Sequence, residues 1–284
     1  MHEITTDQNI PPAQNVVSTE LEPGQEEYDV RKTEVPAQTL ISTEPASART
    51  GIHWSWGDLL LIFFVSIAFF LVVAVILAVV FVVVLRNAAL YEGSALLLEA
   101  VALVGGVYLL GLRRRRHSWA AIGIRSTSRR WLLGAIGLGL LLVLVMGLVA
   151  NGMQVLLRQP GVNPQQNLFL PNGLSWVSII GTILFGGVAV PFAEELFFRG
   201  VLYTFLRERW GVWIGAVVSA MLFGAAHLNI SVGVAVFILG LVSALVYERT
   251  KSLWPSIIIH VVNNSFKFIL VYALLAATTR IPLI

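Results

Sequence analysis

Ionisable side chains embedded in apolar sequence are the most informative feature of this chain. Glu194, Glu195 and Arg199 lie in one short apolar stretch, and two histidines, His227 and His260, follow in later apolar stretches. Placing such groups in hydrocarbon costs free energy, so residues of this kind usually line a site for chemistry or transport. These five positions therefore mark the candidate site.

The two adjacent glutamates are expected to have different tasks. Glu195 and Arg199 are four residues apart with the acid first, the favourable order for an ion pair on one helix face. Glu194 points about 100° away from Glu195 on a helix of 3.6 residues per turn. We therefore expect Arg199 to neutralise Glu195 and Glu194 to face another part of the site.

Two further pairs repeat the spacing of four residues. Phe223 precedes His227, and His260 precedes Asn264, so each pair lies on one helix face. Hydrogen bonds between helices would also explain a lone histidine or asparagine in a span. Lys267, one turn further on, is expected to snorkel or to pair with an acid.

Elimination narrows the chemistry that these residues can support. Asp58 is the only aspartate beyond the N-terminal tail, which excludes an intramembrane aspartate pair and a Ser-His-Asp triad. The chain has no cysteine and no His-Glu-x-x-His motif. A serine–histidine dyad using Ser219 or Ser243 stays formally open. The set best suited to catalysis is Glu194, His227, His260 and Asn264.

This set can activate a water molecule in two ways, and residue identity does not separate them. Glu194 can act as the general base, assisted by His227, while His260 and Asn264 bind the oxyanion of a tetrahedral intermediate. Alternatively, Glu194, His227 and His260 can hold one divalent metal ion such as zinc, whose bound water is acidified.

The composition indicates the kind of protein that positions these residues. The chain is 57% hydrophobic and 12% charged with a mean hydropathy of +0.80, far from soluble globular proteins. Its basic residues cluster beside apolar runs, so we expect a lipid bilayer as partner and no nucleic acid. The sequence therefore predicts an all-α polytopic membrane protein.

The apolar runs predict about seven to eight transmembrane helices, eight if the helix splits around Pro191. Gly186 and Gly187 are expected to loosen the helix there. A polar tail over residues 1–55 has the composition of a disordered segment. The seven runs lie near residues 57–85, 94–112, 131–157, 174–206, 211–228, 232–248 and 254–277.

Basic residues between the runs predict the orientation. The strongest basic loop is expected in the cytoplasm; it contains Arg113, Arg114, Arg115, Arg116, Arg125, Arg129 and Arg130. Counting crossings from it places the N-terminus in the cytoplasm and the polar segment around residues 151–172 outside.

The motifs together resemble the CAAX protease and bacteriocin-processing (CPBP, or Abi) family of intramembrane endopeptidases. The resemblance rests on Glu-Glu-x-x-x-Arg, Phe-x-x-x-His and His-x-x-x-Asn, in this order on successive apolar segments. It implies a cavity open toward the cytoplasm, with Glu194 and His227 activating water, and His260 and Asn264 at the oxyanion. Glu195, Arg199 and Phe223 would be supporting residues, and metal use by the family is disputed.

We expect three parts: the polar tail over 1–55, N-terminal transmembrane helices over 56–173, and a catalytic core over 174–277 that resembles the CPBP family. We also expect an integral protein of a bacterial plasma membrane. The leading hypothesis is an endopeptidase, glutamate-dependent or metal-dependent, that cleaves a membrane-associated or prenylated CAAX-type protein or peptide precursor. The alternative is a non-catalytic immunity or partner-binding protein, or a transporter, that uses the same polar cavity.

Overall fold

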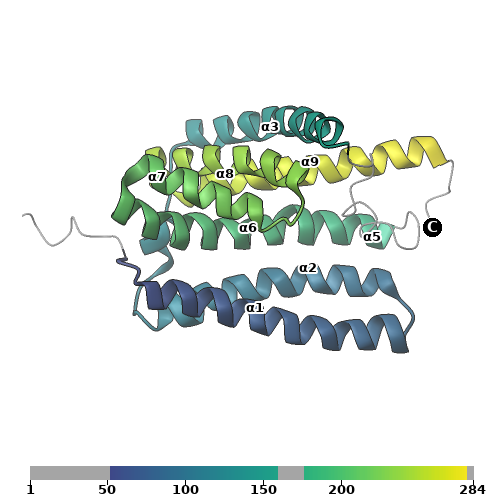
Figure 1. Cartoon of the computed structure of the whole chain (residues 1–284), viewed down its shortest axis with the longest axis horizontal. Coiled ribbons are helices and arrows are strands. Elements are labelled where there is room, and N and C mark those ends of the chain that lie inside the picture. The colour runs from purple at the N-terminus through teal and green to yellow at the C-terminus, as the bar shows by residue number, and fades with distance from the viewer. Residues whose placement is uncertain (1–51, 159–175, 280–284) are drawn as a thin grey trace, which may run out of the picture. The chain divides into compact units, whose positions relative to one another are not determined.

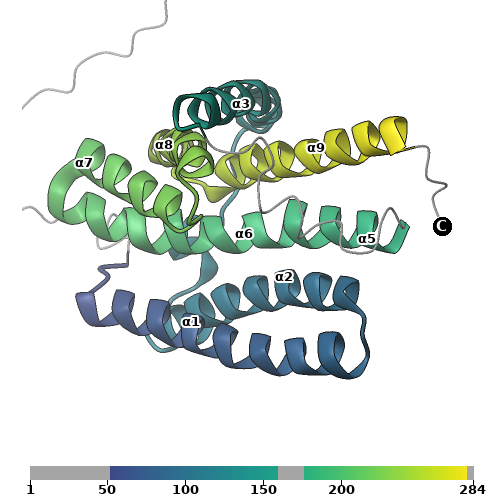
Figure 2. The ribbon, with the colours of Figure 1, turned by 45° about the vertical axis from the view of Figure 1, so that its right-hand side comes forward.

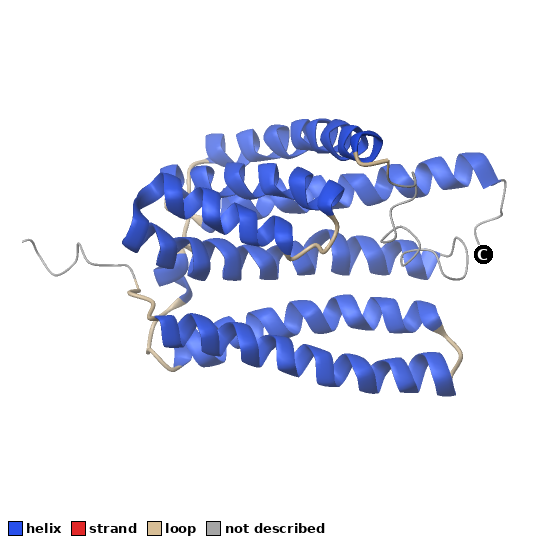
Figure 3. Cartoon of the chain, viewed as in Figure 1, coloured by secondary structure: helices blue, strands red, loops and turns tan. Residues whose placement is uncertain are grey.

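The computed structural model describes residues 52–158 and 176–279. Outside this range lies the expected tail, except for its last four residues. Most of the polar segment around residues 151–172 and the expected boundary at residue 173 also lie outside it. Within the described residues every regular element is a helix and none is a strand (Figure 3). The predicted all-α fold is confirmed.

The described helices follow the chain in this order. The N-terminal hairpin consists of α1, Trp56–Ala78, which continues into the wide π-helical turns of η4, Val79–Val84, and α2, Ala88–Gly105, which continues into η5, Gly106–Arg113. After the short 3₁₀ helix η6, Trp119–Ile122, comes α3, Arg129–Leu156. The remaining elements are α5 Trp176–Gly181, η7 Thr182–Ala189, α6 Val190–Glu195, η8 Leu196–Tyr203, α7 Thr204–Ala225, α8 Ile230–Thr250 and α9 Leu253–Thr279.

Six helices in the described residues are long and apolar enough to cross a membrane, fewer than the seven to eight predicted. The difference arises from one continuous run of 48 residues over Ser178–Ala225. At about 1.5 Å per residue, such a run is much longer than a ~30 Å hydrocarbon layer. It contains a break at Gly211, where φ is 80° and ψ is 175°. The break gives two arms, which correspond to the expected runs near 174–206 and 211–228.

The two arms fold back against each other across Gly211 (Figures 1 and 2). A Cβ atom added to Gly215 would lie 2.8 Å from the backbone nitrogen of Arg207, so only glycine permits this approach. Further along, the Ser219 hydroxyl donates to the Phe198 carbonyl at 3.2 Å. The turn at Gly211 therefore brings the segment that contains His227 beside the segment that contains Glu194.

The α6 segment occupies the middle of the bundle. It packs on α2 of the N-terminal hairpin on one side and on α9 on the other, while α3 packs on α8 and α9 (Figures 1 and 2). The described membrane-spanning helices and the short helices between them belong to one compact unit. The glutamates on α6 consequently lie between helices from both halves of the chain.

Pro191 does not split the helix, contrary to the alternative of eight helices. The chain stays helical through α6, and the expected loosening takes the form of the wide turns of η7 before it and η8 after it. Proline has no N–H, so the Gly187 carbonyl lacks its usual α-helical donor. The Ser265 hydroxyl of α9 donates to this carbonyl at 3.1 Å. The proline thus creates an acceptor that links α9 to the run containing α6.

Two glycines allow α7 and α8 to touch backbone to backbone. A Cβ atom on Gly224 would lie 2.5 Å from the Gly233 carbonyl oxygen, and one on Gly233 would lie 2.8 Å from the Gly224 carbonyl oxygen. Small residues permit this kind of approach between membrane helices. The contact at Gly224 fixes the end of α7 and lies three residues before His227.

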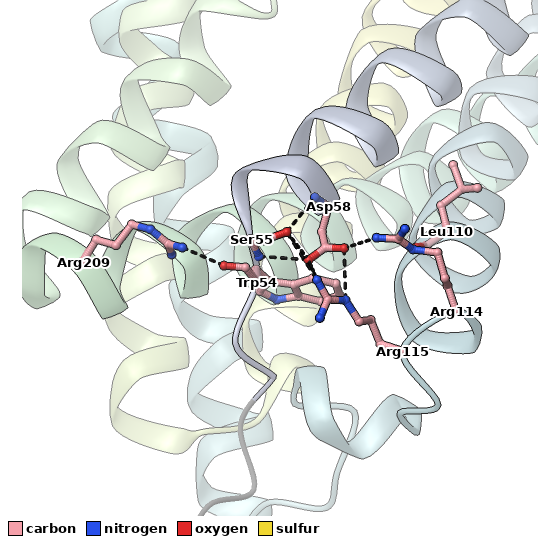
Figure 4. A network of polar contacts seen from close by, with 7 residues as sticks. All are labelled: Trp54, Ser55, Asp58, Leu110, Arg114, Arg115 and Arg209. Carbon is pink, nitrogen blue, oxygen red and sulfur yellow. Dashed lines mark hydrogen bonds and ion pairs between the residues drawn. The ribbon is translucent and has the colours of Figure 1, made fainter.

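A polar network fixes the start of α1 (Figure 4). The Asp58 carboxylate is buried, caps the helix with Ser55, and pairs with Arg114 and Arg115. The Arg115 Nε also donates to Asp58 at 3.1 Å. Two arginines of the strongest basic loop are therefore ion-pair partners of α1 and tie the ends of the hairpin together.

The residue before this cap reaches the central run. The Trp54 indole, 1% exposed, donates to the Gly200 carbonyl at 3.2 Å, and Arg209 donates to the Trp54 carbonyl at 2.8 Å (Figure 4). The N-terminal hairpin is thereby attached to the central run at Gly200, one residue after Arg199.

We predict that Gly224→Ala destabilises the protein by about 1–3 kcal/mol, because the added methyl group collides with backbone that cannot rotate away. Thermal unfolding in detergent measures this loss. Gly147→Ala on α3 is the matched control, since a Cβ there meets nothing within 4 Å. Equal melting temperatures for both variants would contradict the close α7–α8 contact.

Candidate functional site

A buried ion pair forms the base of the candidate site. The Arg199 Nη1 lies 2.8 Å from the Glu195 Oε1, and the two side chains are 1% and 0% exposed. This is the pair predicted from their spacing of four residues. Since a lone charge in this interior would be strongly unfavourable, each residue requires the other.

His260 joins this pair from α9. Its Nδ1 lies 2.9 Å from the same Glu195 oxygen, and its Nε2 lies 3.6 Å from the Glu194 Oε2. An ionised carboxylate only accepts hydrogen bonds, so the Nδ1 carries the proton and the Nε2 is directed to Glu194. Glu195 therefore orients His260 as well as neutralising Arg199, a link between helices that sequence spacing does not reveal.

The Phe223 ring contacts both histidine rings. Its side chain is fully buried, and its ring centroid lies 5.2 Å from that of His227 and 5.5 Å from that of His260, in T-shaped arrangements in both cases. The Arg199 guanidinium lies 4.6 Å from the same centroid. The Phe223 ring thus supports the buried cation and packs against both histidines.

His227 follows the last turn of α7 and is half-buried. Its Nδ1 lies 3.0 Å from the Phe223 carbonyl oxygen, which can only accept a hydrogen bond. The Nδ1 therefore carries the proton, and the Nε2 is free to accept one. Asn264 is half-buried on α9, one turn beyond His260 and on the same side of the helix. Its assignment to the oxyanion stays a prediction.

Two charged residues outside the predicted catalytic set lie on the helices that pack on α6. Glu99 lies on α2, and Lys267 lies on α9. Sequence analysis noted Lys267 for its spacing but did not place it in the site. Its place on the His260 face was the available signal, whereas nothing in the sequence connected Glu99 to Glu194.

The alternative of a three-ligand metal site does not fit the arrangement. Within residues 52–158 and 176–279, no three His, Cys, Asp or Glu side chains gather as a group able to hold a metal ion. Of the proposed ligands, His260 lies 3.6 Å from Glu194, whereas the ion pairs of the described residues do not join His227 to Glu194. The structure therefore does not support the metalloprotease expectation.

The arrangement separates structural from reactive groups. Glu195 pairs with Arg199 and holds His260, whereas Glu194, 13% exposed, has no contact with the guanidinium in the ion pairs of the described residues. Glu194 and the two Nε2 atoms are the groups left to exchange protons with a bound molecule. Such a set can deprotonate water and protonate a leaving group.

We predict that Glu195→Gln lowers the unfolding free energy by about 3–5 kcal/mol, because it leaves the buried Arg199 without a counter-charge. Unfolding monitored in detergent or nanodiscs gives the value. Glu208→Gln is the control, since that residue pairs with the exposed His53 and should change stability by less than about 1 kcal/mol. A loss as small as the control's would show that the buried pair is not needed.

Comparisons with known proteins are informative for the C-terminal half. Residues 176–266 match the family model described as Type II CAAX prenyl endopeptidase Rce1-like. A Bacillus subtilis (strain 168) protein named "Putative membrane peptidase YdiL" is 27% identical over 88 residues, which are 31% of this chain and 36% of that protein. An Escherichia coli protein named "Uncharacterized 24.3 kDa protein" is 28% identical over 142 residues, which are 48% of this chain and 61% of that protein.

The matched part thus spans about a third to three fifths of these relatives, and no solved structure gives a significant match. All motif residues from Glu194 to Asn264 fall inside residues 176–266. The six long apolar helices make the chain an integral membrane protein. The match of residues 176–266 to the Rce1-like family model agrees with the resemblance found in the motifs.

Proposed function

We propose that this protein is an intramembrane endopeptidase that hydrolyses a peptide bond in a membrane-associated or prenylated CAAX-type protein or peptide precursor. One observation carries the proposal. The fold gathers Glu194 and His260 with a spacing of 3.6 Å, and it uses the neighbouring Glu195 and Arg199 only as support. The match to the Rce1-like family supports the same reaction class.

The reaction proceeds by direct attack of water. Glu194 takes one proton from the water molecule, and the oxygen of the water bonds to the scissile carbonyl carbon. Asn264 donates a hydrogen bond to the resulting oxyanion. His260 also donates to the oxyanion from its Nε2 when the imidazole ring carries a second proton, and the positive charge of the ring then faces the Glu195 carboxylate. The proton on Glu194 passes to the amine as the C–N bond breaks, with the His227 Nε2 as an intermediate acceptor.

The position of the site favours a bond close to one membrane surface. Glu194 lies six residues before Gly200, about 9 Å along the helix, and the Gly200 carbonyl is held by Trp54 at the start of α1. Basic residues gather at this end; Arg125 donates to the Lys251 carbonyl there. We assign this end to the cytoplasm by its positive charge, which also places the N-terminus there.

Cleavage of a prenylated CAAX peptide tests the activity. We predict that purified protein in liposomes releases the C-terminal fragment, and that Glu194→Ala or His227→Ala lowers the rate at least about 100-fold, as expected for loss of a general base. Mass spectrometry of the products measures both the rate and the cleavage site. Glu208→Gln, remote from the cluster, is the matched control and should retain the rate.

Full activity of both alanine variants would overturn the catalytic assignment. A protein that never cleaves, and whose Glu194→Gln variant performs its cellular task as well as the unaltered chain, would instead be a binding protein.

A second prediction concerns metal dependence. Because the three candidate ligands do not gather as a metal-binding group, we expect cleavage to survive dialysis against a chelator. Elemental analysis of the purified protein should show less than about one zinc per four chains, since a catalytic site holds one ion when loaded. Stoichiometric zinc that disappears in His260→Ala would contradict this account.

A further inference from the structure

Lys267 is the charged residue of the site that the motifs leave unexplained. It lies on α9 one residue beyond the segment that matches the Rce1-like family, residues 176–266. An ammonium group inside a membrane span is costly unless an anion compensates it. None of the ion pairs among the described residues includes Lys267.

The helix geometry directs this side chain to the reactive groups. Lys267 follows His260 by seven residues, or two turns, so both lie on nearly the same face of α9. Side chains on a helix lean toward its N-terminus, which here is the direction of Asn264 and His260. The four-carbon stem of lysine is flexible enough to span much of the remaining rise.

The contacts of α9 hold it against the run that contains Glu194. His260 lies 3.6 Å from Glu194, and the Ser265 hydroxyl, two residues before Lys267, donates to the Gly187 carbonyl. Gly187 has no side chain, and a Cβ there would lie 2.7 Å from the Ser265 Oγ. The two helices are therefore in close contact at the level of His260 and at the level of Ser265.

The charges around Lys267 leave one anion for it. Glu195 is already paired with Arg199 and with His260. Glu99 lies on α2, which packs on α6 from the side opposite α9. Glu194 of α6 faces α9, where His260 lies 3.6 Å away, and the ion pairs of the described residues join it to no lysine or arginine. Glu194 is therefore the acid available to Lys267.

We propose that Lys267 is a positioning residue whose ammonium group is the counter-cation of the Glu194 carboxylate. Arg199 is the rigidly held cation that neutralises Glu195. Lys267, on a flexible side chain, neutralises Glu194 and orients its carboxylate toward the reacting groups. The consequence for catalysis depends on the proposed peptidase function, but the charge pairing itself does not.

A thermal double-mutant cycle tests the pairing without any substrate. Lys267→Met, Glu194→Gln and the double variant are compared in the full-length protein in nanodiscs. We expect the melting temperature of the double variant to exceed the value predicted by adding the two single changes by at least about 2–4 °C. Each single change leaves one buried charge without its partner, whereas the double change removes both charges. The matched cycle of Lys267→Met with Glu99→Gln should be additive. Additivity in the Glu194 cycle, or equal coupling in both cycles, would overturn the proposal.

Kinetics of the prenylated CAAX peptide distinguish positioning from a purely structural effect. We expect Lys267→Met to lower kcat at least about tenfold with KM within a factor of two, and Lys267→Arg to recover most of kcat. A raised KM with unchanged kcat would overturn the positioning role. If the unaltered protein cleaves nothing but the Glu194 cycle is coupled, the peptidase function fails and the charge pairing stands.

Discussion

The Glu195 carboxylate is the interaction on which the site depends. It receives Arg199 at 2.8 Å from its own helical run and His260 at 2.9 Å from α9, all in a fully buried environment. Removing one charge from such a cluster is far more costly than removing all of them. The cluster therefore fixes the distance between the two helices and directs the second nitrogen of His260 to Glu194. In this account the second glutamate of the motif is structural so that the first can react.

Close helix contacts make this polar cluster possible in an apolar bundle. The Gly224–Gly233 contact and the Gly187–Ser265 contact bring α7 to α8 and α9 to the central run. The break at Gly211 returns the chain so that Phe223 reaches Arg199 and both histidines. In the proposed reaction, Glu194 is the carboxylate that takes up and releases the proton. Tight packing of small residues thus supports chemistry at one glutamate.

Local spacing in the sequence predicted the contacts made within one helix. The contacts between helices depend on the tertiary fold and were not predicted by spacing. The Glu195–Arg199 pair followed from an interval of four residues, and hydropathy identified the membrane class. The link from Glu195 to His260 joins residues 65 positions apart, which periodicity does not encode. Pro191 was the expected breaking point, yet the chain breaks at Gly211, because membrane helices tolerate a proline when the freed carbonyl finds another donor. Glu99 lies on a different helix, so no interval connects it to Glu194.

The most direct measurement of the central claim is the origin of the oxygen in the new C-terminal carboxylate. If Glu194 activates water, a single turnover in ¹⁸O-water places one ¹⁸O in the carboxylate of the new C-terminus, and Glu194 stays unlabelled. If Glu194 instead attacks the carbonyl carbon itself, an anhydride forms that water must open. Attack of that water on the Glu194 carbonyl gives an unlabelled product and places the ¹⁸O in the Glu194 side chain. Mass spectrometry of product and enzyme distinguishes the two. The account predicts the first result, and the second would contradict it.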